Sequence, residues 1–302
     1  MKHLIVITGP TAVGKTALTL QIATRYHTPV VNADSRQMFR QIPVGTAAPT
    51  AAEQAVARHL FVGCLDLQQY YSASMYETDA LQAIADIHAT ADVALLSGGS
   101  MMYIDAVCNG IDDIPTVHDD IRQEVKRQYA EHGLPPMLAQ LQQLDPVHYA
   151  EVDRQNPRRV MHALEICLQT GRPYSDFRTG RHKQRPFHIV KIGLNRERSE
   201  LYQRINSRVD YMMKAGMMQE AQALYPLRHL NALNTVGYKE LFDYMDGRWT
   251  LDEAVERIKG NTRRYARKQL TWFKRDEAIR WFHPDDTEAI VNYINGKLTM
   301  DN

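Results

Sequence analysis

Residues 4–16 read LIVITGPTAVGKT, an apolar run that leads through a glycine-rich turn into a helical pattern. Gly9–Thr16 fits the pattern G-x-x-x-x-G-K-[ST] and lies between a predicted strand and a predicted helix, the setting that this motif requires. Its glycines let backbone N–H groups turn toward phosphate oxygens, and the following helix adds the positive end of its dipole. Lys15 supplies a mobile positive charge, and the Thr16 hydroxyl can hold Mg²⁺.

The motif predicts a phosphate or diphosphate site and does not by itself specify a nucleotide. The residues expected to form this site are Gly9, Pro10, Thr11, Ala12, Val13, Gly14, Lys15 and Thr16.

Apolar strands and helices alternate along the first hundred residues. Short apolar runs at 4–8, 30–33 and 93–96 are separated by segments of helical periodicity, among them 79–88. A further strand is predicted at 188–194. This alternation predicts an α/β fold, a P-loop NTPase-like parallel sheet with helices on both faces.

The middle of the chain does not continue this alternation of strands and helices. Residues 116–185 contain helical stretches and turn signals but no convincing strand, which predicts a helical insertion domain. The P-loop core domain would then comprise residues 1–115 and 186–302, and it would end in long basic helices. One of these is expected to begin at Thr250, whose spacing to Glu253 fits a capping box.

Composition limits the class of protein. The chain has 302 residues, 44% of them hydrophobic and 24% charged, which excludes a collagenous or largely disordered chain. No apolar run reaches the length of a membrane-spanning helix, which is about 20 residues. The three cysteines, Cys64, Cys108 and Cys167, lack metal-ligand spacing, so we expect buried thiols in a reducing compartment, the cytoplasm.

The overall charge of +1 hides an asymmetry between the two halves of the chain. Residues 1–153 carry 9 Lys and Arg against 17 Asp and Glu, a balance of −8. Residues 154–302 carry 27 against 18, a balance of +9. A basic half of this kind is typical of a protein that docks a polyanion, although clustered charges also occur on ordinary solvated faces.

An acidic residue is missing from the place where P-loop ATPases usually carry one. The strand at 93–96 is followed by Ser97-Gly98-Gly99-Ser100, and the acid stands instead at Asp34, after the second strand. The carboxyl ends of neighbouring parallel strands face one crevice, so Asp34 and Ser100 should both approach the phosphate held by Lys15. Asp34 is then a candidate general base for an incoming nucleophile. The structural alternatives are a helix N-cap for Asp34 and a turn residue for Ser100.

Together these motifs resemble the tRNA dimethylallyltransferase (tRNA isopentenyltransferase) family. The resemblance runs in order from about residue 3 to about residue 283. It is most specific in the P-loop combined with TRRYARKQLTWF at 262–273. The segments that carry it are Gly9–Thr16, Asp34–Gln37, Ser97–Ser100 with Tyr103, Leu201–Asp210, Thr235–Glu240 and Asn261–Lys274.

The resemblance implies transfer of a dimethylallyl group from dimethylallyl diphosphate to the exocyclic amine of the tRNA adenosine 3′ of the anticodon. It also implies that the P-loop and Mg²⁺ hold the donor diphosphate instead of ATP, and that the target base flips into a channel. By position, Asp34 would be the general base, and Ser100, where the family usually has threonine, would orient the reacting groups. Lys15 would act on the diphosphate, and Arg198 and Arg208 are candidates for stabilising it as it leaves.

The family pattern also implies which residues hold the anticodon stem-loop of tRNA. Arg and Lys side chains suit phosphates, Gln37 suits a base edge, and aromatic rings suit stacking. His162 stands where the family usually has arginine. The residues concerned are Asp34, Ser35, Arg36, Gln37, Ser100, Arg122, Arg158, Arg159, Val160, Met161, His162, Gly237, Tyr238, Arg267, Lys268, Gln269 and Trp272.

Two other functions fit parts of this pattern. A P-loop small-molecule kinase that uses ATP would share the phosphate cradle, but it would not explain the basic C-terminal helix or the missing strand-end acid. An RNA-binding protein with a phosphate-sensing switch would explain the basic half without any chemistry. No dimer-forming pattern is visible, so we expect a monomer that binds tRNA and dimethylallyl diphosphate.

Overall fold

The computed structural model of the chain describes residues 1–180 and 182–300. It divides into two compact units, which we describe separately. The first consists of Met1–Asn109 and Gln184–Asn302, and the second of Gly110–Lys183.

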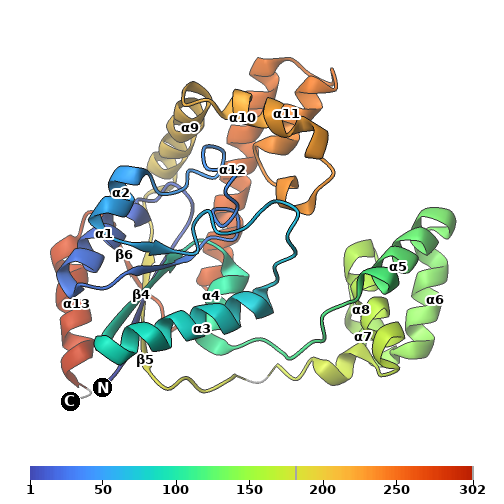
Figure 1. Cartoon of the computed structure of the whole chain (residues 1–302), viewed down its shortest axis with the longest axis horizontal. Coiled ribbons are helices and arrows are strands. Elements are labelled where there is room, and N and C mark those ends of the chain that lie inside the picture. The colour runs from blue at the N-terminus through green and yellow to red at the C-terminus, as the bar shows by residue number, and fades with distance from the viewer. Residues whose placement is uncertain (181, 301–302) are drawn as a thin grey trace. The chain divides into compact units, whose positions relative to one another are not determined.

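A six-stranded parallel sheet organises the first unit (Figure 1). The strand order is β3-β2-β4-β1-β5-β6, so β1 lies in the interior between β4 and β5. In sequence order the strands are β1 His3–Thr8, β2 Val30–Ala33, β3 His59–Leu60, β4 Val93–Gly98, β5 His188–Leu194 and β6 Arg280–Phe282.

Helices cover both faces of this sheet, which explains why β1 is a continuous apolar run and does not alternate with polar residues. Leu4 and Val6 pack into the core on one face, while Ile5 and Ile7 pack into the core on the other. The first core is completed mainly by α3 (Ala73–Thr90) and α4 (Met101–Asn109). The second is completed mainly by α1 (Lys15–Tyr26), α9 (Arg198–Lys214) and α13 (Thr287–Met300).

Helix α12 (Leu251–Phe273) connects all the cores of the first unit. Phe273 packs into one sheet core and Ala266 into the other. Ile258 packs into a third core with α9, α10 (Met217–Leu224) and α11 (Tyr238–Met245). The helix begins as predicted, since the Thr250 hydroxyl accepts the Glu253 N–H and the Glu253 carboxylate accepts the Thr250 N–H in a capping box.

The second unit is built from short helices around its own core. In its described residues there are helices and no strand. Asp145, which is fully buried, accepts hydrogen bonds from the backbone N–H of His148 and from the N–H and hydroxyl of Ser175. The elements are α5 Asp119–His132, α6 Leu134–Leu144, α7 Pro146–Glu151, α8 Pro157–Thr170 and the 3₁₀ helix η1 Tyr174–Phe177.

The structure differs from the sequence-based expectations in two respects. The edge strands β3 and β6 were not predicted from the sequence; with two and three residues they are too short to show a periodicity. Cys64 is exposed in the loop after β3, whereas only Cys108 and Cys167 are buried as expected.

In the described part of the chain, no helix combines the length and apolarity needed to cross a membrane.

Candidate active site

The phosphate loop joins β1 to α1 in a conformation that its glycines permit. Gly9 has φ of 145°, and a Cβ at this position would lie 2.5 Å from the carbonyl oxygen of Leu194 in β5. Gly14 has φ of 116° and precedes the first residue of α1, Lys15. The loop therefore presses directly against the neighbouring strand, which explains why only glycine fits at its start.

Lys15 lies folded over this loop. Its Nζ donates hydrogen bonds to the carbonyl oxygens of Gly9 (2.9 Å) and Pro10 (2.8 Å). Burial and the nearby Arg208 lower the pKa of Lys15 to about 7, although Asp34 opposes this shift. The ammonium group therefore lies in a site where a bound anion would stabilise its charge.

Gln269 of α12 connects the phosphate loop to the turn after β4. Its Oε1 accepts the backbone N–H of Thr11 (2.9 Å), and its Nε2 donates to the carbonyl oxygen of Gly99 (2.8 Å). Only 2% of this residue is exposed. The side chain thus positions the loop from the interior of the protein.

We expect the substitution Gln269→Met to lower the free energy of unfolding by about 1–3 kcal/mol, because it removes the acceptor of the partly buried Thr11 N–H and the donor to the buried Gly99 carbonyl oxygen. Gln269→Glu keeps the acceptor for the Thr11 N–H. At a pH where the introduced acid is neutral, it should therefore lower the free energy of unfolding less than Gln269→Met does. Urea unfolding measures both. A Gln269→Met protein as stable as the wild type would contradict this role.

Asp34 and Ser100 lie next to each other at the ends of two paired strands, β2 and β4. Asp34 Oδ1 accepts the N–H groups of Arg36 (3.0 Å) and Gln37 (3.4 Å), so the carboxylate closes a turn and does not cap a helix. The Ser100 hydroxyl accepts the Ser35 N–H (2.8 Å) and lies 3.1 Å from the Ser35 hydroxyl. These bonds fix the turn that carries Asp34.

Two cavities meet at this turn. The first, of about 750 Å³, is lined by the phosphate loop, including Lys15 and Thr16. The second, of about 550 Å³, is lined by Ser100 and Lys268 among others. The residues that line both are Thr11, Asp34, Arg208 and Tyr265. A molecule in each cavity would therefore meet the other beside the Asp34 carboxylate.

Helix α9 supplies the arginines of the first cavity. Burial lowers the pKa of Arg208, although the nearby Asp34 carboxylate opposes this shift. Arg204 also lines the cavity, and its Nε donates to the carbonyl oxygen of Ala12 (2.9 Å). Arg204 was not predicted from the sequence, although its spacing of four residues from Arg208 places both on one helix face. Arg198 lines neither cavity; its Nε bonds instead to the Tyr202 hydroxyl (3.1 Å).

Other residues expected to bind tRNA hold the loops around the cavities. Arg36 donates to the carbonyl oxygen of Ala232 (3.1 Å), and Gln37 donates to that of Ala47 (3.0 Å). Gly237 and Tyr238 are buried at the start of α11. The Tyr238 hydroxyl donates to Glu220, which in turn accepts backbone N–H groups of the loop at 44–45.

The remaining candidates of the first unit lie along α12. Arg267 and Lys268 are exposed, and Arg267 reaches the Tyr202 hydroxyl at 3.4 Å. Trp272 is half-buried and donates Nε1–H to Asp105 (2.8 Å). Arginine and lysine side chains are therefore available at the surface of this helix, whereas Gln269 is not.

The candidates of the second unit lie on two of its helices. Arg158, Arg159 and His162 are exposed on α8, and Met161 is half-buried there. Val160 is fully buried in the core of this unit. Arg122 lies on α5, 3.8 Å from Asp119. Helix α8 thus presents two arginines and a histidine to solvent.

The relationship of the chain to known proteins agrees with this geometry. A family model described as IPP transferase matches residues 37–276. The chain is 56% identical to tRNA dimethylallyltransferase 2 of Parabacteroides distasonis, over 99% of this chain and 100% of the relative. It is 53% identical to tRNA dimethylallyltransferase 1 of Bacteroides fragilis, over 98% and 99% of the two chains.

Solved structures give the same result. The full-length tRNA isopentenylpyrophosphate transferase of Bacillus halodurans superimposes with a TM-score of 0.72 and 35% identity, covering 99% of this chain and 97% of that one. A eukaryotic dimethylallyltransferase acting on tRNA superimposes with a TM-score of 0.75 and 26% identity, covering 90% and 70%. The predicted P-loop NTPase-like α/β fold is confirmed, and the chain belongs to the IPP transferase family of tRNA dimethylallyltransferases.

Proposed function

We propose that this protein transfers a dimethylallyl group from dimethylallyl diphosphate to the exocyclic amine of the tRNA adenosine 3′ of the anticodon, and releases diphosphate. One observation carries the proposal: a phosphate-binding cavity and a second cavity meet at Asp34. The names of the relatives and of the solved structures support the same reaction.

The donor would occupy the first cavity. Backbone N–H groups of Gly9–Thr16, the Lys15 ammonium group and the Arg208 guanidinium group would bind its diphosphate. Thr16 is exposed on this cavity, and its hydroxyl is an oxygen ligand of the kind that Mg²⁺ accepts beside phosphate oxygens. When bound, Mg²⁺ would neutralise charge on the diphosphate. The same cationic groups would stabilise the charge that builds up as diphosphate leaves.

The acceptor base would enter through the second cavity and present its amine to Asp34. Oδ1 of Asp34 is already held by two backbone N–H groups, which leaves Oδ2 to take the proton. The amine nitrogen forms a bond to C1 of the dimethylallyl group, the C1–O bond to diphosphate breaks, and the amine proton passes to Asp34. Ser100 would orient Asp34 through its contacts with Ser35.

The tRNA would be held mainly through phosphates. Exposed arginine and lysine side chains on α12 and, in the second unit, on α8 supply positive charge. Binding should therefore weaken steeply as salt concentration rises, because phosphate contacts release counterions. The residues that we propose to contact tRNA at these helices are Arg158, Arg159, His162, Arg267 and Lys268. We further propose that the protein acts as a monomer in the cytoplasm.

The kinase alternative accounts for less of the structure. A small-molecule kinase would use the first cavity, but it has no use for a second one lined by Lys239, Arg264 and Lys268. The acid that would hold Mg²⁺ at the end of β4 is also absent, since Ser97 occupies that place and shares a hydrogen bond with Thr19 (2.7 Å).

Donor binding should be linked to proton uptake through Lys15. With a pKa of about 7, Lys15 is mostly neutral at pH 8 in the free protein, and a bound diphosphate restores its charge. We therefore expect most of one proton to be taken up on binding at pH 8, with affinity falling as pH rises above 7. Calorimetry in buffers of different ionisation enthalpy measures this uptake. The same uptake in a Lys15→Met variant would assign the proton to another group.

The reaction itself can be tested on a single stem-loop. We expect labelled dimethylallyl diphosphate and Mg²⁺ to prenylate an anticodon stem-loop that has adenosine 3′ of the anticodon. A matched stem-loop with purine riboside at that position lacks the exocyclic amine and should accept no label. Label in both, or transfer of phosphate from ATP, would refute the proposal.

A further inference from the structure

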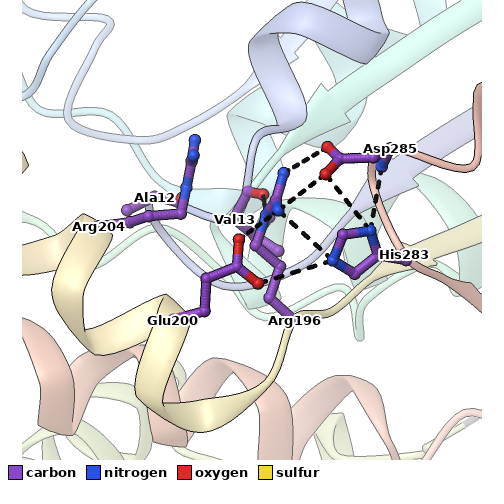
Figure 2. Close-up of polar contacts among 7 residues, drawn as sticks. All are labelled: Ala12, Val13, Arg196, Glu200, Arg204, His283 and Asp285. Carbon is purple, nitrogen blue, oxygen red and sulfur yellow. Dashed lines mark hydrogen bonds and ion pairs between the residues drawn. The ribbon is translucent and has the colours of Figure 1, made fainter.

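Two arginines hold the part of the phosphate loop formed by Ala12 and Val13 (Figure 2). Arg204 donates Nε–H to the carbonyl oxygen of Ala12 (2.9 Å), and Arg196 donates Nε–H to that of Val13 (2.8 Å). Arg196 belongs to the short segment between β5 and α9. Because the peptide unit is planar, a bond that fixes the Val13 carbonyl also fixes the direction of the Gly14 N–H. The hydrogen bond from Arg196 therefore fixes the orientation of the Gly14 N–H, a donor of the phosphate-binding loop.

Arg196 is itself held by a cluster of charged residues. Its side chain is only 7% exposed. It bonds to Glu200 in the first turn of α9 and makes a two-point contact with Asp285 (Nη2–Oδ1 2.6 Å, Nη1–Oδ2 3.2 Å). His283 lies between the two acids, 3.7 Å from Glu200 and 3.6 Å from Asp285. The planar guanidinium group thus spans the phosphate loop and the chain segment after β6.

The segment after β6 also packs directly against the loop. A Cβ placed at Gly14 would lie 3.4 Å from Cβ of Pro284. Residues 283–285 therefore support the loop both by packing and through Arg196. They lie beyond residue 276, where the match to the family model ends.

We infer that Arg196 is a positioning residue for donor binding, and that residues 283–285 hold it in place. The inference rests on the proposal that the phosphate loop binds the donor diphosphate. Lysine cannot replace this arginine, because one ammonium group cannot bond to the Val13 carbonyl and also make the two-point contact with Asp285. Without the hydrogen bond from Arg196 to the Val13 carbonyl oxygen, the Gly14 N–H would no longer be fixed toward the ligand before binding.

Binding of inorganic diphosphate with Mg²⁺, measured by calorimetry, tests this role without any catalytic turnover. We expect Arg196→Lys to weaken binding about tenfold, the lower end of the loss seen when a contact that orients a metal ligand is removed. Asp285→Asn, at a side chain that is 67% exposed, should fold normally and weaken binding about threefold. The dissociation constant for tRNA should stay unchanged in both variants, which a general loss of structure would not allow.

Arg248→Lys is the matched control, because Arg248 also pairs with two acids, Asp243 and Asp246, and lines neither cavity. Its affinity for diphosphate should equal that of the wild type. If the wild type itself does not bind diphosphate, the proposed donor site fails and this inference fails with it. If the wild type binds but Arg196→Lys binds equally well, only this inference is overturned. If Arg196→Lys does not fold, an unchanged affinity in Asp285→Asn overturns it.

Discussion

Asp34→Asn should abolish most prenyl transfer while leaving the site intact. An asparagine oxygen can still accept the N–H groups of Arg36 and Gln37, so the turn is kept. The amide cannot take the proton of the attacking amine. Loss of a general base costs about 10²–10⁴-fold in rate, and we expect kcat to fall by that amount. Steady-state kinetics with dimethylallyl diphosphate and tRNA measures the loss.

Two controls separate this chemistry from binding. Asp34→Asn should keep most of its affinity for tRNA and for diphosphate, because the turn is preserved and the cationic side chains that bind each ligand are unchanged. Asp86→Asn, on the exposed side of α3, should behave as the wild type. An Asp34→Asn enzyme with normal kcat would assign the proton transfer to a different group.

Lys15→Met should produce the other large effect. The substitution keeps an unbranched side chain but removes the charge that lies over the phosphate loop. Loss of one preorganised donor that stabilises charge developing in the transition state lowers the reaction rate about 10²–10³-fold. We expect kcat/KM for dimethylallyl diphosphate to fall by this factor, while the dissociation constant for tRNA does not change.

Lys214→Met serves as the matched control for Lys15. Lys214 is exposed at the end of α9 and lines neither cavity, so its loss should leave kcat/KM unchanged. Equal kinetics for Lys15→Met and the wild type would show that the loop binds its ligand without this lysine.

Several features of the fold and site followed from local sequence. The run Leu4–Ile7 predicted a strand buried on both faces, and the structure packs its alternate residues into two different cores. The motif Gly9–Thr16 predicted the loop and the helix start. The parallel order of the strands then placed Asp34 and Ser100 side by side, because both follow strands that pair in the same direction.

Other features depended on packing that no local pattern encodes. Gln269 stands beside the exposed Lys268, yet the rotation of α12 turns it into the interior, where it bonds to Thr11 and Gly99. The strand β6 has three residues and forms only because β5 offers it a paired edge. The contact of Arg196 with Asp285 joins residues 89 positions apart, so sequence spacing gave no indication of it.

The measurement that tests the central claim most directly is nucleoside mass spectrometry of unmodified total tRNA after incubation with the protein, dimethylallyl diphosphate and Mg²⁺. We expect prenylated adenosine in tRNAs that carry adenosine 3′ of the anticodon, and its near absence with Asp34→Asn. No prenylated nucleoside with the wild-type protein, under conditions in which it binds both tRNA and diphosphate, would contradict the proposed reaction.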